Sequence, residues 1–186
     1  KDFHDHDVLE HSLRACKYSD RQVRLSAMLH DVGKPAVYNA EGHYHGHDAA
    51  GEKLARDILE RLKAPKKLTD TVCRLVALHM YDLDGKAKEN KVRRLIVANY
   101  DVYPLLRLVK QADYSGCKVD LNLCPTLQKW DGIVKKMQEE GVPFSLKQLA
   151  LRGDALENVP PYRRGKILHK LQLWAACDGS LNNEKT

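Results

Sequence analysis

The sequence predicts an all-α fold, and three observations support this prediction. Apolar residues recur at intervals of three and four along nearly the whole chain, the spacing that marks one face of a helix. No run of residues alternates between apolar and polar, as a half-buried strand would. Glycine and proline separate the periodic stretches, for example at Gly33 and Pro35. The 186 residues suffice for one well-buried core.

The first two helices are expected before Gly33, with Asp20 as the N-cap of the second. The polar stretch 38–46 is expected to form a loop or short hairpin over the site, and Asp48 to cap the next helix. The predicted helices cover residues 6–17, 20–32, 48–62, 69–80, 91–98, 102–112, 127–140 and 161–177. We predict one helical domain at 1–120 and a C-terminal helical extension at 121–186.

Composition excludes several classes of protein. No apolar run approaches the roughly 20 residues of a membrane span. The five cysteines are odd in number and never form Cys-x-x-Cys, which argues against a disulfide framework and predicts a reducing cytosol. A net charge of +6 favours anionic partners, and basic residues cluster at 63–67, 86–94 and 163–170, although solvated helix faces explain such clusters equally well. Because residue 1 is Lys rather than Met, we expect a piece of a longer protein.

The pair His30-Asp31 is the most informative feature of the sequence. It follows the apolar stretch that ends at Leu29, in the motif Leu29-His30-Asp31-Val32-Gly33-Lys34-Pro35. Burying an imidazole and a carboxylate is unfavourable unless a partner satisfies them, and a divalent metal ion is a common solution.

Other candidate ligands lie on apolar helix faces. His79 shares a face with Val72 and Val76, and Asp113 shares one with Val109. His47 precedes Leu54 by an interval that places it on the same face. A single histidine in such a position is more often a satisfied core residue, but several helices that each turn a ligand inward favour a shared ion.

Ligand chemistry restricts the ion. We expect four residues to hold one ion: His11, His30, Asp31 and Asp113. His47 and His79 either supply a second ion, with Asp31 as the bridging carboxylate, or contact the ligands or the substrate. Imidazole and carboxylate ligands without a thiolate suit Mn, Fe, Co, Ni or Zn better than Ca, and Mg is an alternative.

The order of these residues resembles the HD superfamily of metal-dependent phosphohydrolases: a histidine, a His-Asp pair, further histidines and a distant aspartate. Longer stretches are similar to the HD region of bacterial CCA-adding tRNA nucleotidyltransferases. They are His6-Asp7-Val8-Leu9-Glu10-His11-Ser12-Leu13, Leu29 to Pro35, Gly42-His43-Tyr44-His45-Gly46-His47, Val92-Arg93-Arg94-Leu95 and Gln111-Ala112-Asp113, then Leu146-Lys147-Gln148-Leu149, Gly153-Asp154-Ala155-Leu156, Gly165-Lys166-Ile167-Leu168 and Asp178-Gly179.

The family adds nucleotides with a head domain in which a Gly-Ser stretch precedes paired aspartates. No such motif occurs here, since Gly179-Ser180 has no Asp-x-Asp after it. The resemblance therefore implies an HD-domain helical bundle with phosphohydrolase activity on phosphomonoesters, 2′,3′-cyclic phosphates or nucleotide diesters. It also implies that tRNA is a partner of a full-length parent.

Within that mechanism Asp31 would bind the ion and either orient a water molecule or accept its proton, and Lys34 would offset phosphate charge. Arg93 and Arg94 are weaker candidates for phosphate contact, and a solvated basic face is the favoured alternative for both. Two other functions stay open: a non-catalytic RNA-binding or structural module that keeps a metal for folding, and a free-standing HD hydrolase of small nucleotides.

Overall fold

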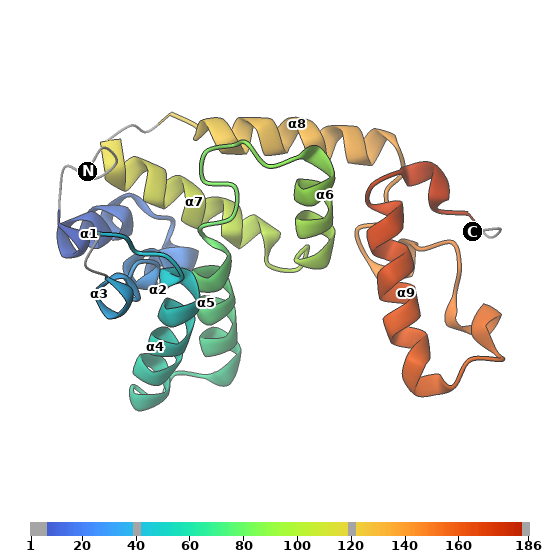
Figure 1. Ribbon diagram of the computed structural model, residues 1–186, viewed down its shortest axis with the longest axis horizontal. Coiled ribbons are helices and arrows are strands. Elements are labelled where there is room, and N and C mark those ends of the chain that lie inside the picture. Colours follow the sequence, from blue (N-terminus) through green and yellow to red (C-terminus); the bar gives the residue numbers. More distant parts are fainter. Residues whose placement is uncertain (1–6, 39–41, 119–121, 184–186) are drawn as a thin grey trace. The chain divides into compact units, whose positions relative to one another are not determined.

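The computed structural model describes residues 7–38, 42–118 and 122–183. Every regular element in these ranges is a helix and none is a strand, which confirms the all-α prediction (Figure 1). The α-helices are α1 (Val8–Tyr18), α2 (Arg24–Leu29), α3 (Lys34–Val37), α4 (His47–Arg61), α5 (Lys66–Leu78), α6 (Glu89–Ala98), α7 (Tyr103–Lys118), α8 (Pro125–Glu139) and α9 (Pro161–Ala175). Short 3₁₀ helices are η1 (Arg21–Val23), η2 (Leu146–Gln148), η3 (Gly153–Leu156) and η4 (Gly179–Leu181).

The helix predicted at 20–32 is wrong in its extent. Asp20 caps η1, α2 follows and ends at Leu29, and a turn then leads into α3. Pro35 lies in the first turn of α3, where the backbone N–H that proline lacks has no helical partner in any case, so this proline begins a helix instead of ending one. The expected loop at 38–46 includes residues 39–41, which are outside the described ranges, and its other residues form no strand.

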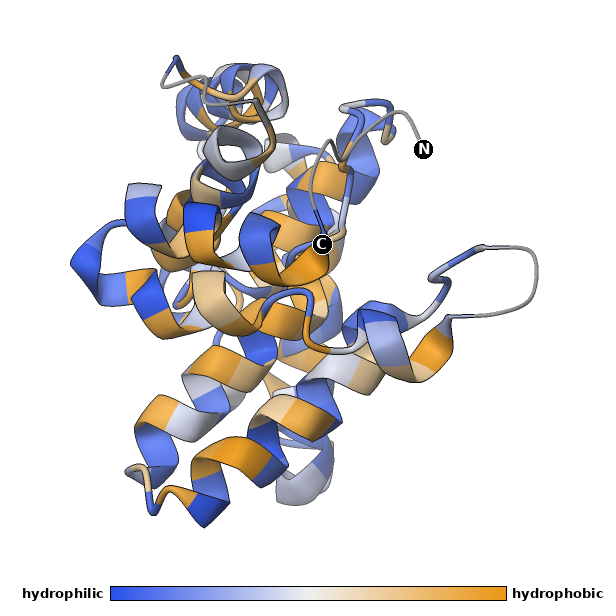
Figure 2. Cartoon of the chain, turned by 90° about the vertical axis from the view of Figure 1, so that its left-hand side faces the viewer, coloured by the Kyte–Doolittle hydropathy of each residue, from blue (hydrophilic) through white to orange (hydrophobic). Residues whose placement is uncertain are grey.

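The chain forms two compact units. The first comprises 1–83 and 104–127, and the second comprises 84–103 and 128–186. In the first unit α4 and α5 lie side by side and enclose a core of Ala55, Leu59, Val72, Cys73 and Val76 (Figure 1). These helices carry both hydrophobic and hydrophilic residues, as expected of amphipathic helices with one buried face (Figure 2).

Small residues bring the helices of the first unit close together. Ala15 of α1, Ala27 of α2 and Ala112 of α7 form one buried cluster. A Cβ atom on Gly116 of α7 would lie 2.9 Å from the backbone nitrogen of Ala15, so only glycine permits this approach of α1 and α7. Likewise, a Cβ atom on Gly33 would lie 2.1 Å from the carbonyl oxygen of His47. These contacts place α1, α2 and α7 near one another and bring the start of α3 close to the start of α4.

The second unit is organised around Arg93 of α6. Its side chain is 2% exposed and donates to Glu140 at 2.7 Å and to Glu89 at 3.1 Å. It also donates to the carbonyl oxygens of Ala176 and Cys177 at the end of α9. The expectation that Arg93 contacts phosphate or lies on a solvated face is therefore wrong, because its hydrogen bonds hold the second unit together.

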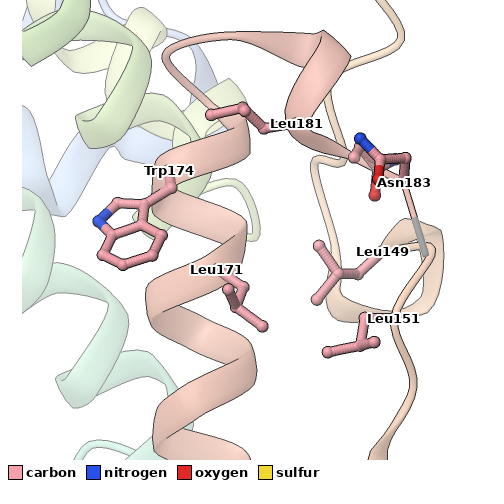
Figure 3. Close-up of a pocket in the computed structure, with 7 residues that line it drawn as sticks. Leu149, Leu151, Leu171, Trp174, Leu181 and Asn183 are labelled. Atoms are coloured by element: carbon pink, nitrogen blue, oxygen red, sulfur yellow. The ribbon is translucent and has the colours of Figure 1, made fainter. Parts of the chain in front are cut away.

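The segment after α8 closes against α9 through apolar contacts. Leu171 of α9 faces Leu149 and Leu151 across a small hollow (Figure 3). Asn182 bridges the backbone there, since its side chain accepts from the N–H of Ala150 at 2.7 Å and donates to the carbonyl of Gln148 at 3.1 Å. No helix in the described part of the chain is both long and apolar enough to cross a membrane.

We expect Arg93→Met to destabilise the second unit by about 3 kcal/mol, because the change leaves the carbonyl oxygens of Ala176 and Cys177 without the donor that satisfies them. Both tryptophans of the chain, Trp130 and Trp174, lie in this unit, so urea unfolding followed by tryptophan fluorescence measures its stability. Arg94→Met is the matched control. Arg94 is exposed, and its replacement should change the free energy of unfolding by less than about 0.5 kcal/mol. Equal losses in the two variants would contradict this prediction.

Candidate metal centre

All six residues that the sequence singled out as ligands meet inside the first unit. They come from α1 (His11), the turn after α2 (His30 and Asp31), the start of α4 (His47), the residue after α5 (His79) and α7 (Asp113). All except Asp113 are buried, and the side chain of Asp113 is 14% exposed. Residues separated by about 100 positions in the sequence therefore face one small volume.

The carboxylate of Asp31 lies at the middle of the group and each of its oxygens faces two imidazoles. Oδ2 is 3.3 Å from Nε2 of His30 and 3.7 Å from Nε2 of His11. Oδ1 is 3.3 Å from Nε2 of His47 and 3.7 Å from Nε2 of His79. Two sets of candidate ligands thus share Asp31, one on each side of its carboxylate.

Backbone carbonyls fix the orientation of three of these imidazoles. Nδ1 of His30 lies 2.7 Å from the carbonyl oxygen of Ala27, and Nδ1 of His79 lies 2.6 Å from that of Val76. His47 makes the equivalent bond to Tyr44 at 2.8 Å. A carbonyl can only accept, so Nδ1 carries the proton in each ring. In the neutral imidazole, Nε2 is then an acceptor directed at Asp31.

The Nε2 atoms consequently face one another in pairs. Nε2 of His47 is 3.3 Å from Nε2 of His79, with Asp31 Oδ1 near both. On the other side, Nε2 of His11 is 3.0 Å from Nε2 of His30. Lone pairs at these distances repel unless a cation or a proton lies between them. The donor set therefore fits a divalent ion on each side of Asp31, with the Nδ1 bonds orienting the ligands.

Asp113 completes the side that contains His11 and His30. Its Oδ1 lies 2.9 Å from Nε2 of His11 and 3.4 Å from Nε2 of His30. A second carboxylate here adds negative charge in a buried region, which strengthens the requirement for positive charge between these groups.

The pKa values of the histidine and aspartate side chains in the metal-free centre show the same need for positive charge between the carboxylates. Burial alone opposes the charged imidazole of His30, but hydrogen bonds to Asp113 and Asp31 outweigh burial and raise its pKa from 6.5 to about 10. Burial also favours a neutral Asp31, whereas hydrogen bonds from His30, His47 and His79 hold the pKa of this carboxyl far below its usual range. The pKa of Asp113 is lowered in the same way, because hydrogen bonds from His11 and His30 outweigh burial.

Two lysines support the centre. Lys34 is buried at the start of α3, and its Nζ lies 2.5 Å from Asp31 Oδ2 and 5.7 Å from the ring centre of Tyr44. Lys110 of α7, which sequence reasoning missed, donates from a buried Nζ to the carbonyls of His79 and Tyr81 at 3.0 and 2.7 Å. Burial lowers the pKa of Lys110. Lys110 thereby fixes the turn that presents His79.

One further ligand type lies at the edge of the centre. Cys117, four residues after Asp113 on α7, belongs with His11 and Asp113 to a third group that could hold an ion. Sequence reasoning missed it, because the cysteines form no Cys-x-x-Cys pair that would indicate a metal site. The interval of four residues from Asp113 was the available signal.

Fold and site together define a helical domain with a buried centre of histidine and aspartate side chains. The model of the HD domain family matches residues 7–115, which is more than half of the chain, and the chain belongs to this family. No solved structure matches the chain significantly.

Similar curated proteins are tRNA nucleotidyltransferases. An A-adding tRNA nucleotidyltransferase of Deinococcus radiodurans is 32% identical over 128 residues, which are 62% of this chain and 29% of that protein. A CC-adding tRNA nucleotidyltransferase of Thermus thermophilus is 31% identical over 120 residues, 61% of this chain and 27% of that protein. A multifunctional CCA protein of Hahella chejuensis is 42% identical over 55 residues, 28% and 13% of the two chains. The matched regions span less than a third of these relatives.

Metal binding should strengthen as the pH rises through the neutral range. With its pKa raised to about 10, His30 is protonated in the metal-free protein, and an ion must displace that proton. The apparent affinity for Mn²⁺ should therefore rise between about pH 6 and pH 8, by up to about tenfold per pH unit for each proton displaced. Calorimetric titration in buffers that differ in heat of ionisation counts the protons released.

His45→Gln is the control for this measurement, because His45 is exposed in the loop before α4. The variant should release the same number of protons as the parent chain. Binding of Mn²⁺ without proton release, at an affinity that does not change with pH, would contradict the prediction.

Proposed function

We propose that this chain is a metal-dependent phosphohydrolase region of a tRNA nucleotidyltransferase-like protein. Its substrates would be phosphomonoesters and phosphodiesters of nucleotides or RNA ends, including 2′,3′-cyclic phosphates, in the context of tRNA 3′-end processing. The observation that carries the proposal is the opposition of imidazole Nε2 atoms on both sides of the buried Asp31 carboxylate. Membership of the HD domain family supports it.

The proposed metal is one or two divalent transition ions, Mn, Fe, Co, Ni or Zn, with Mg as the alternative. His11, His30, Asp31 and Asp113 would hold the first ion, and Asp31, His47 and His79 would hold the second. A bound ion would supply a water molecule of lowered pKa and positive charge against the phosphate.

Asp31 and Lys34 are the proposed catalytic residues. Each oxygen of Asp31 faces imidazoles of one ligand set, which favours a role in binding the ion and orienting water. Lys34 places a buried ammonium group against Asp31 Oδ2. From there it would balance negative charge as an anionic substrate enters the centre.

RNA is the proposed partner, and several observations support this choice. The relatives named above are tRNA nucleotidyltransferases, and the net charge of +6 suits a polyanion. Five cysteines without a Cys-x-x-Cys pair support a cytoplasmic location.

A second candidate function is RNA binding without catalysis, and a surface of α9 favours it. Tyr162 is 74% exposed, with the guanidinium of Arg163 5.5 Å from its ring centre. Lys166 and Lys170 line the same hollow. An exposed aromatic ring among basic side chains suits base stacking and phosphate contact. This function predicts salt-sensitive RNA affinity and no turnover with any metal. A free-standing HD nucleotide hydrolase is a third alternative, which the gene sequence before Lys1 would test.

Replacement of Asp31 should remove metal and activity together. Asp31→Asn keeps the shape of the side chain but lacks the charge that both ligand sets use, so bound metal and hydrolysis should each fall by more than about 100-fold. The measurements are metal analysis of the purified protein and hydrolysis of mono-, di- and cyclic phosphates with Mn, Co, Ni and Mg. Asp57→Asn, an exposed position on α4, is the control. Full turnover in Asp31→Asn would contradict the mechanism.

Lys34→Met should separate metal binding from turnover. The variant keeps every proposed ligand, so bound metal should stay near the parent level, whereas turnover should fall about 10- to 100-fold because a charged hydrogen bond is lost. Lys53→Met, an exposed lysine of α4, serves as the control. Unchanged turnover in Lys34→Met would remove Lys34 from the mechanism. Lys34→Arg should recover part of the rate if charge is what matters.

A further inference from the structure

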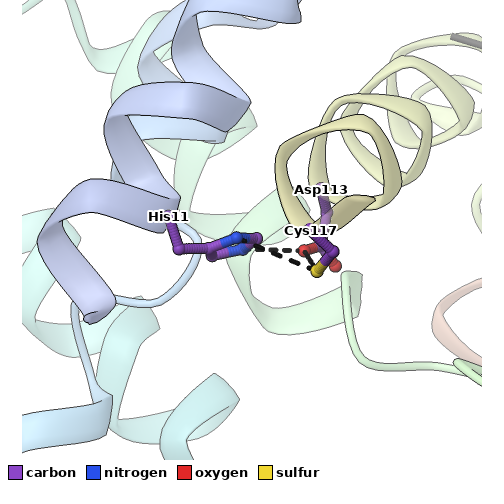
Figure 4. A group of neighbouring side chains, drawn as sticks. All are labelled: His11, Asp113 and Cys117. Atoms are coloured by element: carbon purple, nitrogen blue, oxygen red, sulfur yellow. Dashed lines mark hydrogen bonds and ion pairs between the residues drawn. The ribbon is translucent and has the colours of Figure 1, made fainter. Parts of the chain in front are cut away.

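A thiol lies beside two ligands of the candidate metal centre, His11 and Asp113. Sγ of Cys117 is 3.8 Å from Nδ1 of His11 and 3.9 Å from Oδ1 of Asp113, as Figure 4 shows. One ligand atom from each of the three residues can be chosen so that all lie within 4.8 Å of one another. The three side chains come from α1 and α7, the helices that Gly116 and Ala15 hold in close contact.

These separations suit ligands of a single ion. With a Zn–S bond of about 2.3 Å and Zn–N or Zn–O bonds of about 2.1 Å, a tetrahedral ion places sulfur about 3.6 Å from each of the other atoms. The measured separations of 3.8 and 3.9 Å exceed that value by only a few tenths of an ångström. A rotamer adjustment of Cys117 is enough to close the difference.

The position on α7 gives a second reason. Asp113 and Cys117 are four residues apart and therefore on one helix face, so a single helix presents both toward His11. Cys117 is half-buried and lies on the same side of Asp31 as His11 and His30. A thiol at this point changes which ions the centre prefers, because thiolate selects Zn²⁺, Co²⁺ and other soft ions over Mn²⁺ and Mg²⁺.

We propose that Cys117, with His11 and Asp113, binds a thiophilic divalent ion such as Zn²⁺ or Co²⁺ at the edge of the centre. On binding, the ion replaces the thiol proton, which leaves to solvent. The proposal rests on the proposed function only in that the two share His11 and Asp113. His11 and Asp113 are also proposed ligands of the first hydrolytic ion, so a soft ion held by Cys117 would compete with that ion for these two residues and oppose hydrolysis.

X-ray absorption of the Zn-loaded parent chain tests the proposal without any variant. A sulfur scatterer should appear about 2.3 Å from zinc, beside nitrogen and oxygen at about 2.0–2.2 Å. Co²⁺ loading should add a near-ultraviolet thiolate-to-cobalt charge-transfer band. A zinc shell of nitrogen and oxygen alone, with no charge-transfer band, would overturn the proposal.

Variants assign the sulfur to its residue. Cys117→Ser should lose the sulfur scatterer and the charge-transfer band, and its Zn²⁺ affinity should fall at least about tenfold while its Mn²⁺ affinity stays within about threefold. Cys16→Ser, on the helix that carries His11, is the matched control and should keep both signals. Persistence of both signals in Cys117→Ser would assign the sulfur elsewhere and overturn the proposal. Absence of phosphohydrolase activity in the parent chain would reject the proposed function while leaving these coordination measurements intact.

Discussion

The buried carboxylate of Asp31 is the constraint on which the first unit depends. A carboxylate that is 2% exposed is unfavourable unless positive charge or donors surround it. Here four imidazoles and the ammonium group of Lys34 face its two oxygens. Each of these partners comes from a different element, so satisfying one side chain requires those elements to meet at one place. The packing of these helices creates the site, and the partners that Asp31 requires in turn stabilise that packing.

Packing meets that condition through backbone contacts. Alanines at the junction of α1, α2 and α7, and glycines 33 and 116, let main chains approach more closely than larger residues allow. Carbonyls one turn before His30 and His79 then hold the Nδ1 atoms, which leaves each Nε2 directed inward. The carboxyls and His30 have strongly shifted pKa values because hydrogen bonds among these buried groups outweigh the effect of burial, and a divalent ion held by the same ligands would take the place of the proton on His30.

Much of this arrangement could be predicted from the sequence, because polar residues on apolar faces are visible in one dimension. His79 and Asp113 share faces with valines, and the structure turns both inward beside Asp31. The positions of most helices followed from apolar spacing for the same reason. The metal-binding and catalytic roles of these residues stay predictions.

What could not be predicted depends on contacts between distant segments. The cluster at 86–94 has the composition of a solvated basic face. Arg93 is nevertheless buried, and its guanidinium donates to carbonyl oxygens more than 80 residues later in the sequence. Nothing near Lys110 indicates that it anchors the turn of His79. Pro35 follows Gly33 and so predicts the end of a helix. Proline ends a helix when it would fall in the interior, but it is tolerated in the first turn, which is where Pro35 lies in α3.

In the second unit, residues of the closing segment that resemble the tRNA nucleotidyltransferases have roles in packing. Asp178 accepts from the N–H of Ser180 and caps η4, and a Cβ atom on Gly179 would lie 2.1 Å from the carbonyl oxygen of Glu140. Arg93 joins that same Glu140 to the end of α9. Motif residues that resemble the nucleotidyltransferases thus have sufficient structural reasons to occur. The case for hydrolysis must therefore come from the centre around Asp31, where no packing requirement explains the opposed imidazole nitrogens.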